Sequence, residues 1–271
     1  MHENKTLNER LIFSTAAIAK EAGEAIIKIY NSNFDYQLKK DLSPITAADN
    51  LSNNIIIKRL KLLTPEIPIL SEESCNIPYP IRQQWTQFWL VDPLDGTKEF
   101  INKNGEFTVN IALIEQNIPI LGVIHIPVTG ETYWGSATNG SFYTKEDNNV
   151  RQINVSKNLK NPVRILASRS HPSKALDSLL SKIKDYEIIY RGSSIKFCLI
   201  ASGKADLYPR LGPTSEWDTA AGEAIVSFAG GYTLTKNGLP LAYNSKESLL
   251  NPNFLVSSQK TLAQKSWSLM S

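Results

Sequence analysis

A short apolar run that ends in two acids constrains this chain more than any other stretch of its sequence. Residues 88–91 (Phe-Trp-Leu-Val) predict a buried strand, and Asp92 and Asp95 follow at its C-terminal end. Gly96 lets the main chain approach a ligand closely because it has no Cβ. Thr97 then supplies a hydroxyl and a backbone N–H at the start of a short helix. This pattern indicates a divalent metal beside a bound phosphate.

The periodicity of the first half predicts helices followed by a run of strands packed on them. We expect helices over 7–30 and 47–63, and strands over 67–70, 107–114, 118–126, 132–134 and 141–144. The polar stretch 36–46 and the Pro- and Gln-containing residues before the central strand predict irregular structure.

The second half alternates between strand and helix. We expect strands over 163–167, 187–190, 205–208, 232–235 and 254–257, and helices over 173–183, 194–202, 218–229 and from 259 onward. A chain of 271 residues can form two lobes. We therefore predict an N-terminal α+β lobe over 1–155 that carries most metal ligands, and a C-terminal α/β lobe over 156–271.

Charge and composition exclude several classes of protein. Lys and Arg exceed Asp and Glu by 29 − 26 = 3, which is too little for a nucleic-acid partner but suits a small anionic substrate. The N-terminus is polar, and no apolar stretch approaches the roughly 20 residues that span a bilayer. We expect no integral membrane segment and a cytoplasmic protein; peripheral attachment to the inner face of the cell membrane stays open.

Two further acids join Asp92 and Asp95 as candidate metal ligands. Glu72 follows a predicted strand and Asp218 stands at a predicted helix start. Hard oxygen ligands of this kind suit Mg²⁺ or Ca²⁺. Glu72 alone also fits a solvated strand end, and Asp218 alone fits a helix N-cap, so these alternatives remain for each.

Asp49 lies in the first turn of the second predicted helix. In that position it can simply complement the helix dipole. It can also act as a base that orients the hydroxyl of Thr97, which in turn aligns a water molecule. The pattern alone leaves both interpretations open.

Three motifs together resemble the inositol monophosphatase superfamily of Mg²⁺-dependent, lithium-sensitive phosphatases. They are Glu72-Glu73-Ser74, Asp92-Pro-Leu-Asp95-Gly96-Thr97 and Trp217-Asp218-Thr-Ala-Ala-Gly222. Leu94 with Lys98-Glu99-Phe100, the stretch 40–49, and Gly192-Ser-Ser-Ile-Lys196 through Arg210 are similar to the branch that hydrolyses adenosine 3′,5′-bisphosphate. The resemblance covers nearly the whole chain. It implies a layered αβαβα sandwich of two lobes, like that of inositol monophosphatase and fructose-1,6-bisphosphatase.

The resemblance also implies a ligand set for two to three Mg²⁺ ions. One site would use Glu72, Asp92 and the main-chain carbonyl of Leu94, and a second would use Asp92, Asp95 and Asp218. A weaker third ion would be held by Glu72 through waters. Asp49 and Thr97 would activate the attacking water.

The expected substrate contacts come from the same motifs and from loops that follow strands. The backbone N–H groups around Gly96 and Thr97 would hold the reacting phosphate, while Lys196 and Arg210 are candidate partners of the second phosphate. Arg169 is also compatible with a solvated loop position instead of substrate binding. His171 is also compatible with the start of a helix instead of a ligand role. The full expected set is Asp95, Gly96, Thr97, Lys98, Ser168, Ser194, Lys196, Arg210 and Asp218.

The resulting hypothesis is in-line attack of water on the 3′-phosphate, which yields AMP and phosphate without a phosphoenzyme. A haloacid-dehalogenase-type phosphatase is disfavoured because its two acids stand two apart, whereas Asp92 and Asp95 stand three apart with Pro93 between them. Two alternatives remain: an inositol or sugar-phosphate phosphatase with the same metals, and a non-catalytic protein that binds metal and a phosphorylated metabolite. The oligomeric state stays open between monomer and homodimer.

Overall fold

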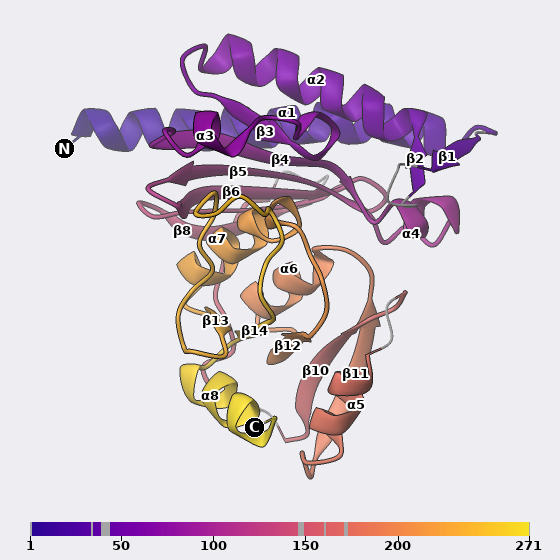
Figure 1. Ribbon diagram of the computed structural model, residues 1–271, viewed down its shortest axis with the longest axis vertical. Coiled ribbons are helices and arrows are strands. Elements are labelled where there is room, and N and C mark those ends of the chain that lie inside the picture. The colour runs from indigo at the N-terminus through magenta and orange to yellow at the C-terminus, as the bar shows by residue number, and fades with distance from the viewer. Residues whose placement is uncertain are drawn as a thin grey trace.

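Five layers of secondary structure are stacked in the order helix, sheet, helix, sheet, helix (Figure 1). The computed structural model describes residues 2–33, 35–38, 44–145, 149–159, 161–170 and 173–270. The outer helices α1 (His2–Tyr30) and α2 (Ala47–Leu63) cover the first sheet. Helices α6 (Ile195–Ala201) and α7 (Ala220–Phe228) lie between the sheets, and α5 (Lys174–Leu180) and α8 (Lys260–Leu269) close the far side. The expected layered α/β fold is confirmed.

The first sheet has seven described strands in the order β3-β4-β5-β6-β7-β8-β9. Only the β3–β4 pair among them is parallel. Trp89 and Val91 pack with α1 and α2, while Leu90 packs in the core that contains α6 and α7. This alternation follows from the two-residue period of a strand. The strands are β3 (Ile69–Ser71), β4 (Gln87–Asp95), β5 (Thr108–Glu115), β6 (Ile118–Ile126), β7 (Glu131–Ser136), β8 (Gly140–Thr144) and β9 (Arg151–Ile153).

The second sheet has five described strands in the order β11-β10-β12-β14-β13. One face packs against α5 and α8, where Leu180, Ala263 and Trp267 meet strand residues such as Leu255. The other face shares the central core with α6 and α7. The strands are β10 (Val163–Ser168), β11 (Tyr186–Arg191), β12 (Leu207–Arg210), β13 (Tyr232–Thr235) and β14 (Phe254–Ser257).

Helix α7 lies unusually close to the first sheet because glycine replaces a side chain where they touch. A Cβ at Gly122 of β6 would lie 2.4 Å from the carbonyl oxygen of Ala221 and 2.8 Å from the Cβ of Ala224. On its other side α7 contacts α6, where a Cβ at Gly222 would lie 2.3 Å from a ring carbon of Phe197. Helix α7 is therefore fixed between the sheet and α6 by close backbone packing.

Several local predictions were wrong, each for a tertiary reason. The predicted irregular stretch 36–46 contains the antiparallel pair β1 (Tyr36–Leu38) and β2 (Pro44–Thr46), although residues 39–43 lie outside the described part of the chain. The predicted loop before β4 contains the 3₁₀ turn η1 (Glu72–Ser74) and α3 (Tyr79–Arg82). Buried Arg82 donates to Asn244 and to the Glu247 carbonyl. Such distant partners are invisible to local periodicity.

The helix predicted over 218–229 begins two residues late. Residues 216–218 form a separate 3₁₀ turn, η2 (Glu216–Asp218), and Thr219 precedes α7. The helix predicted over 173–183 is likewise confined to α5. The predicted elements 47–63, 118–126, 232–235 and 254–257 have the predicted ends, and the other predicted elements are present with shifted ends. The division into lobes at 155/156 stays a prediction.

The part of the chain that the structure describes contains no helix that is both sufficiently long and sufficiently apolar to traverse a bilayer.

Buried Glu223 of α7 gives the fold a testable pH dependence. Burial raises the pKa of Glu223 to about 8, although hydrogen bonds from Tyr243 (2.5 Å) and the Leu241 N–H oppose this. The folded protein therefore binds this proton more tightly than the unfolded chain. The associated stability is fully present below about pH 4.5, the ordinary value, and is lost as the pH rises through about 8.

We expect Glu223→Gln to flatten this pH dependence. Between pH 5 and 8 the wild type should lose unfolding free energy relative to E223Q, by at most about 1.4 kcal/mol per pH unit. Urea unfolding at several pH values measures the difference, with exposed Glu24→Gln on α1 as the control. Parallel pH profiles of wild type and E223Q would contradict the prediction.

Candidate active site

A cavity of about 510 Å³ lies where the C-terminal end of β4 meets the loops of the second sheet. Every residue of the expected substrate set lines it, and so does Glu72. A neighbouring cavity of about 390 Å³ shares part of its wall. The predicted residues that line the first cavity are Glu72, Asp95, Gly96, Thr97, Lys98, Ser168, Ser194, Lys196, Arg210 and Asp218, and the shared wall is formed by Ser168, Tyr208, Arg210 and Pro213.

A β-bulge in β4 turns both acids of the central motif toward the same side. Asp92 pairs with Asn110 of β5 and Asp95 pairs with Thr108, so three steps on β4 match two steps on β5. Residues two apart on β5 share one face of the sheet. Asp92 and Asp95 therefore face the same side as Asn110 and Thr108, which is the side of α6. Bulges of this kind re-aim side chains at functional sites.

The residues of the bulge are held in place from both directions. The Ser52 hydroxyl of α2 donates to the carbonyl of Pro93 at 2.7 Å, and the Leu94 N–H donates to Oδ1 of Asp92 at 3.1 Å. The Leu94 side chain is buried in the core under α1 and α2. Gly96 follows with φ of 94°, a conformation that favours glycine. The turn is thus rigid before any ligand binds.

Four carboxylates act on one another at this site: Glu72, Asp95 and Asp218 line the cavity, whereas Asp92 is buried and does not line it. Burial raises the pKa of Asp92 well above its usual value, and the nearby charges of Glu72, Asp95 and Asp218 raise it further. Burial also raises the pKa of Asp218, as do Asp95 and Glu72. Carboxylates brought together away from water repel one another when they are charged, and a nearby cation relieves this repulsion. Among the described residues, no group of three or more His, Cys, Asp or Glu side chains is arranged so that it could hold a metal ion without a change in side-chain positions.

The chemistry of this donor set fits Mg²⁺. All four side chains offer hard oxygen atoms, and they come from η1, β4 and η2. Magnesium prefers carboxylate oxygens and keeps open positions for substrate phosphate. The mutual repulsion of the acids would be relieved by a bound divalent cation.

Asp218 reaches the cavity from a 3₁₀ turn and not from a helix N-cap. Its Oδ2 accepts a hydrogen bond from the Ser215 N–H at 2.9 Å, and this contact fixes the turn. The helix N-cap was one of the two alternatives that the sequence left open for Asp218. The cap position belongs instead to Thr219, which places Asp218 one residue before the cap.

Asp49 has contacts both at the start of its own helix and with Thr97. Its Oδ2 accepts hydrogen bonds from the N–H and the hydroxyl of Thr46, each at 2.7 Å, in a capping box at the start of α2. Its Oδ1 accepts a hydrogen bond from the Thr97 hydroxyl at 3.1 Å. The contact between Asp49 and Thr97 thus links α2 to the start of α4 (Thr97–Ile101).

Cationic and polar groups line the same cavity as the acids. Lys196 is buried, and burial lowers its pKa to about 8 although Asp95 opposes the shift. The Nε of Arg210 is buried without a hydrogen-bond partner among the described residues. The Ser194 N–H donates to Oδ2 of Asp95 at 2.6 Å. The N–H at the start of α6 is therefore already engaged with Asp95.

Other residues of the cavity were missed by sequence reasoning. Glu99 is buried yet lines the cavity, and Ser193 stands beside it with φ of 46°. The segment 213–215 and Leu250 complete the wall. Glu99 lies in α4, and the others belong to connecting segments, where spacing carries little information. Arg169 is paired with Glu106, and His171 lies outside the described residues.

Fold and site together define a layered αβαβα sandwich with an acidic, oxygen-rich cavity at the edge between its two sheets. The inositol monophosphatase family matches residues 7–271. The chain is 47% identical over 241 residues to the 3′(2′),5′-bisphosphate nucleotidase CysQ of Salmonella typhimurium, covering 88% of this chain and 96% of the relative. The chain belongs to the inositol monophosphatase family.

Further similar proteins agree with this assignment. The 3′(2′),5′-bisphosphate nucleotidase CysQ of Buchnera aphidicola is 46% identical over 256 residues, which are 92% of this chain and 94% of the relative. The crystal structure of CysQ from Bacteroides thetaiotaomicron, a bacterial member of the family, superposes with a TM-score of 0.81 at 38% identity, covering 92% of this chain and 98% of that one.

Proposed function

We propose that the chain is a Mg²⁺-dependent phosphatase that hydrolyses the 3′-phosphate of adenosine 3′,5′-bisphosphate to AMP and phosphate. The observation that carries the proposal is that acidic and cationic side chains line one cavity. Asp95 and Asp218 line it together with Lys196 and Arg210. A substrate with one phosphate to cleave and another to hold fits such a cavity. The relatives named as bisphosphate nucleotidases support this substrate class.

Glu72, Asp92, Asp95, Asp218 and the Leu94 carbonyl would hold two to three Mg²⁺ ions. When bound, these ions neutralise the phosphate, lower the pKa of water and stabilise the leaving oxygen. Phosphate monoesters hydrolyse extremely slowly without such help.

The chain's own residues orient the attacking water. The Thr97 hydroxyl has its single proton within reach of Asp49 at 3.1 Å and of the Leu94 carbonyl at 3.4 Å. Donation to Asp49, the shorter contact, leaves the lone pairs of that oxygen for the cavity. Thr97 can then accept a hydrogen bond from water, and the buried Asp49 carboxylate keeps the hydroxyl in this orientation. The backbone around Gly96 and Thr97 would hold the reacting phosphate. Lys98 and Ser168, which line the same cavity, would also contact the substrate.

The second phosphate would be recognised by Lys196 and Arg210. The unpartnered Nε of Arg210 is buried, and an anionic oxygen would satisfy it. The neighbouring cavity beyond Ser168 and Tyr208 gives room for the rest of a nucleotide. We also propose lithium sensitivity, a role in sulfur metabolism and a cytoplasmic location.

Phosphate release from a substrate panel tests the proposed function. The panel holds adenosine 3′,5′- and 2′,5′-bisphosphates, inositol monophosphates and a sugar phosphate, each with Mg²⁺ and with or without Li⁺. We expect the adenosine bisphosphates to be cleaved with at least tenfold higher kcat/KM, a difference of about 1.4 kcal/mol in transition-state stabilisation. A preference for inositol phosphates would make these, and not adenosine bisphosphates, the proposed substrates. The absence of any phosphate release would favour a non-catalytic binding protein.

A further inference from the structure

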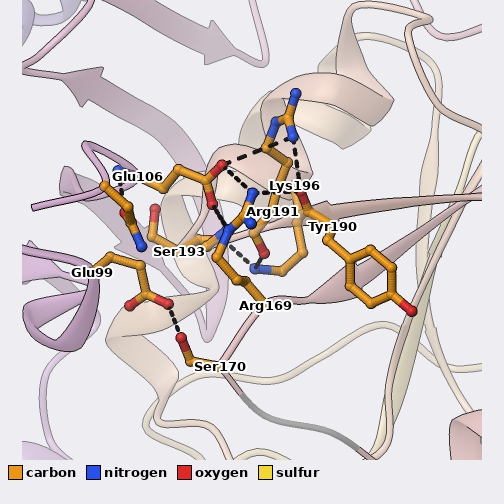
Figure 2. Close-up of polar contacts among 10 residues, drawn as sticks. Glu99, Glu106, Arg169, Ser170, Tyr190, Arg191, Ser193 and Lys196 are labelled. Carbon is orange, nitrogen blue, oxygen red and sulfur yellow. Dashed lines mark hydrogen bonds and ion pairs between the residues drawn. The ribbon is translucent and has the colours of Figure 1, made fainter. Parts of the chain in front are cut away.

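Glu106 joins the first sheet to the loops of the second sheet beside the cavity (Figure 2). It lies between α4 and β5, and its neighbour Phe107 is fully buried. The Phe107 ring packs on the rings of Tyr30 and Phe100 at 5.0 and 5.2 Å. The backbone of Glu106 is therefore anchored in the core under α1.

The carboxylate of Glu106 collects donors from the ends of two strands of the other sheet. Arg169, after β10, donates to it twice, through Nε and Nη2, each at 2.8 Å. The Gly192 N–H, after β11, donates to it at 2.7 Å, and Arg191 lies 3.8 Å away. Figure 2 shows these groups converging on the single carboxylate. Although burial opposes it, these donors lower the pKa of Glu106, so it is charged.

The segment that Glu106 binds leads directly to Lys196, a cationic residue that lines the cavity. Ser193 follows Gly192 with a left-handed φ of 46°. Lys196 then donates its Nζ hydrogens back to the carbonyls of Arg191 (3.2 Å) and Ser193 (2.6 Å). The position of the Lys196 ammonium is thus set by carbonyls of the turn that Glu106 fixes.

The backbone of the turn at Gly192 is closely surrounded by neighbouring atoms. A Cβ at Gly192 would lie 2.7 Å from Cγ of Glu99 and 2.9 Å from the Glu106 carbonyl oxygen. Glu99 in turn accepts a hydrogen bond from Ser170 at 2.5 Å, which ties down the segment after Arg169. The backbone at Gly192 passes between Glu99 of α4 and Glu106 of the segment before β5, and of these two acids it is Glu106 that accepts the Gly192 N–H.

We propose that Glu106 is a positioning residue for the second phosphate of the substrate, acting through the turn 191–193 on Lys196. This inference rests on the proposed function, because it concerns the anion-binding end of the same cavity. Glu106 itself does not line that cavity. Its removal should therefore weaken recognition of the second phosphate and leave the hydrolytic residues in place.

The experiment compares Glu106→Gln with wild type on two substrates. Adenosine 3′,5′-bisphosphate uses both ends of the cavity, and p-nitrophenyl phosphate has only the phosphate that is cleaved. We expect E106Q to raise KM for the bisphosphate about tenfold and change kcat less than twofold, with both parameters for p-nitrophenyl phosphate unchanged. The amide keeps one acceptor oxygen but places N–H donors against the guanidinium of Arg169.

The matched control is Glu21→Gln. Glu21 of α1 accepts the same two hydrogen bonds, at 2.8 Å each, from Nε and Nη2 of Arg59 of α2. That pair lies outside the cavity. E21Q should leave KM for both substrates unchanged.

Two further variants separate positioning from direct contact. Arg169→Gln should raise KM for the bisphosphate less than E106Q does, because the bond from the Gly192 N–H to Glu106 remains. The double variant should stay within about twofold of E106Q, because the bond from Arg169 to the Tyr190 carbonyl is longer, at 3.3 Å. A larger effect of R169Q would overturn the inference by making Arg169 the direct contact. Unchanged KM in E106Q, or equal losses on both substrates with a lower Tm, would also overturn it. If the wild type itself prefers inositol phosphates, the proposed function fails regardless of E106Q.

Discussion

Replacing Asp92 by Asn is expected to lower kcat at least about 10³-fold and to leave the fold intact. Asp92 is proposed as a ligand shared between metal ions, and a bound ion contributes several kcal/mol to phosphate hydrolysis. Asn can still accept the hydrogen bond from the Leu94 N–H that Asp92 accepts. It also removes a buried carboxylate whose pKa is raised by burial and by the charges of Glu72, Asp95 and Asp218.

Thermal unfolding with and without Mg²⁺ gives this prediction a readout besides activity. Mg²⁺ should raise the Tm of the wild type, since a ligand at 100 times its Kd adds about 2.7 kcal/mol of stability. The Tm of D92N should respond much less, and its Tm without metal should equal or exceed that of the wild type. Exposed Asp177→Asn is the control. A D92N variant with wild-type turnover would remove Asp92 from the proposed ligand set.

The largest loss of stability is expected from Gly122→Val. Any Cβ at Gly122 meets the backbone of Ala221 at 2.4 Å and the Cβ of Ala224 at 2.8 Å. Neither atom belongs to a flexible side chain, so α7 as a whole would have to move. Overpacking costs typically 1–3 kcal/mol and more where backbone must shift. We expect about 3 kcal/mol, which corresponds to a Tm lower by roughly 6–12 °C.

Gly212→Ala is the matched control for this prediction. No heavy atom lies within 4 Å of a Cβ built at Gly212, so its Tm should change by no more than a degree or two. Urea unfolding of both variants gives the difference in free energy. A G122V protein as stable as G212A would show that α7 can move away from β6 at little cost.

The central motif was predictable because its information is local. The apolar run 88–91 and the acids that follow define β4 and its end without reference to the rest of the chain. The contact between Asp49 and Thr97 crosses from α2 to α4. The residues alone left its two interpretations open, and the resemblance supplied the contact. Periodicity in the second half located its strands because each is a short apolar segment between turns.

The remainder of the site depends on pairs that are distant in sequence. Glu106 receives its donors from residues more than 60 positions further along the chain, and nothing around it marks it as an acceptor. The start of the helix predicted at Asp218 was two residues early because an acid before a helical run resembles a cap, whereas the hydrogen bond of Asp218 with Ser215 closes a separate turn. The requirement for glycine at 122 arises only when α7 is laid on β6.

The bulge in β4 has a consequence for which mutations this protein can tolerate. Pro93 and Leu94 have no partners in the pairing register with β5, so the Leu94 carbonyl is available as the proposed main-chain ligand. A point mutation cannot delete a backbone oxygen. Variation at position 94 is therefore limited by how well a side chain fills the apolar space beneath α1 and α2, whereas an insertion or deletion between the two acids would remove the ligand at once.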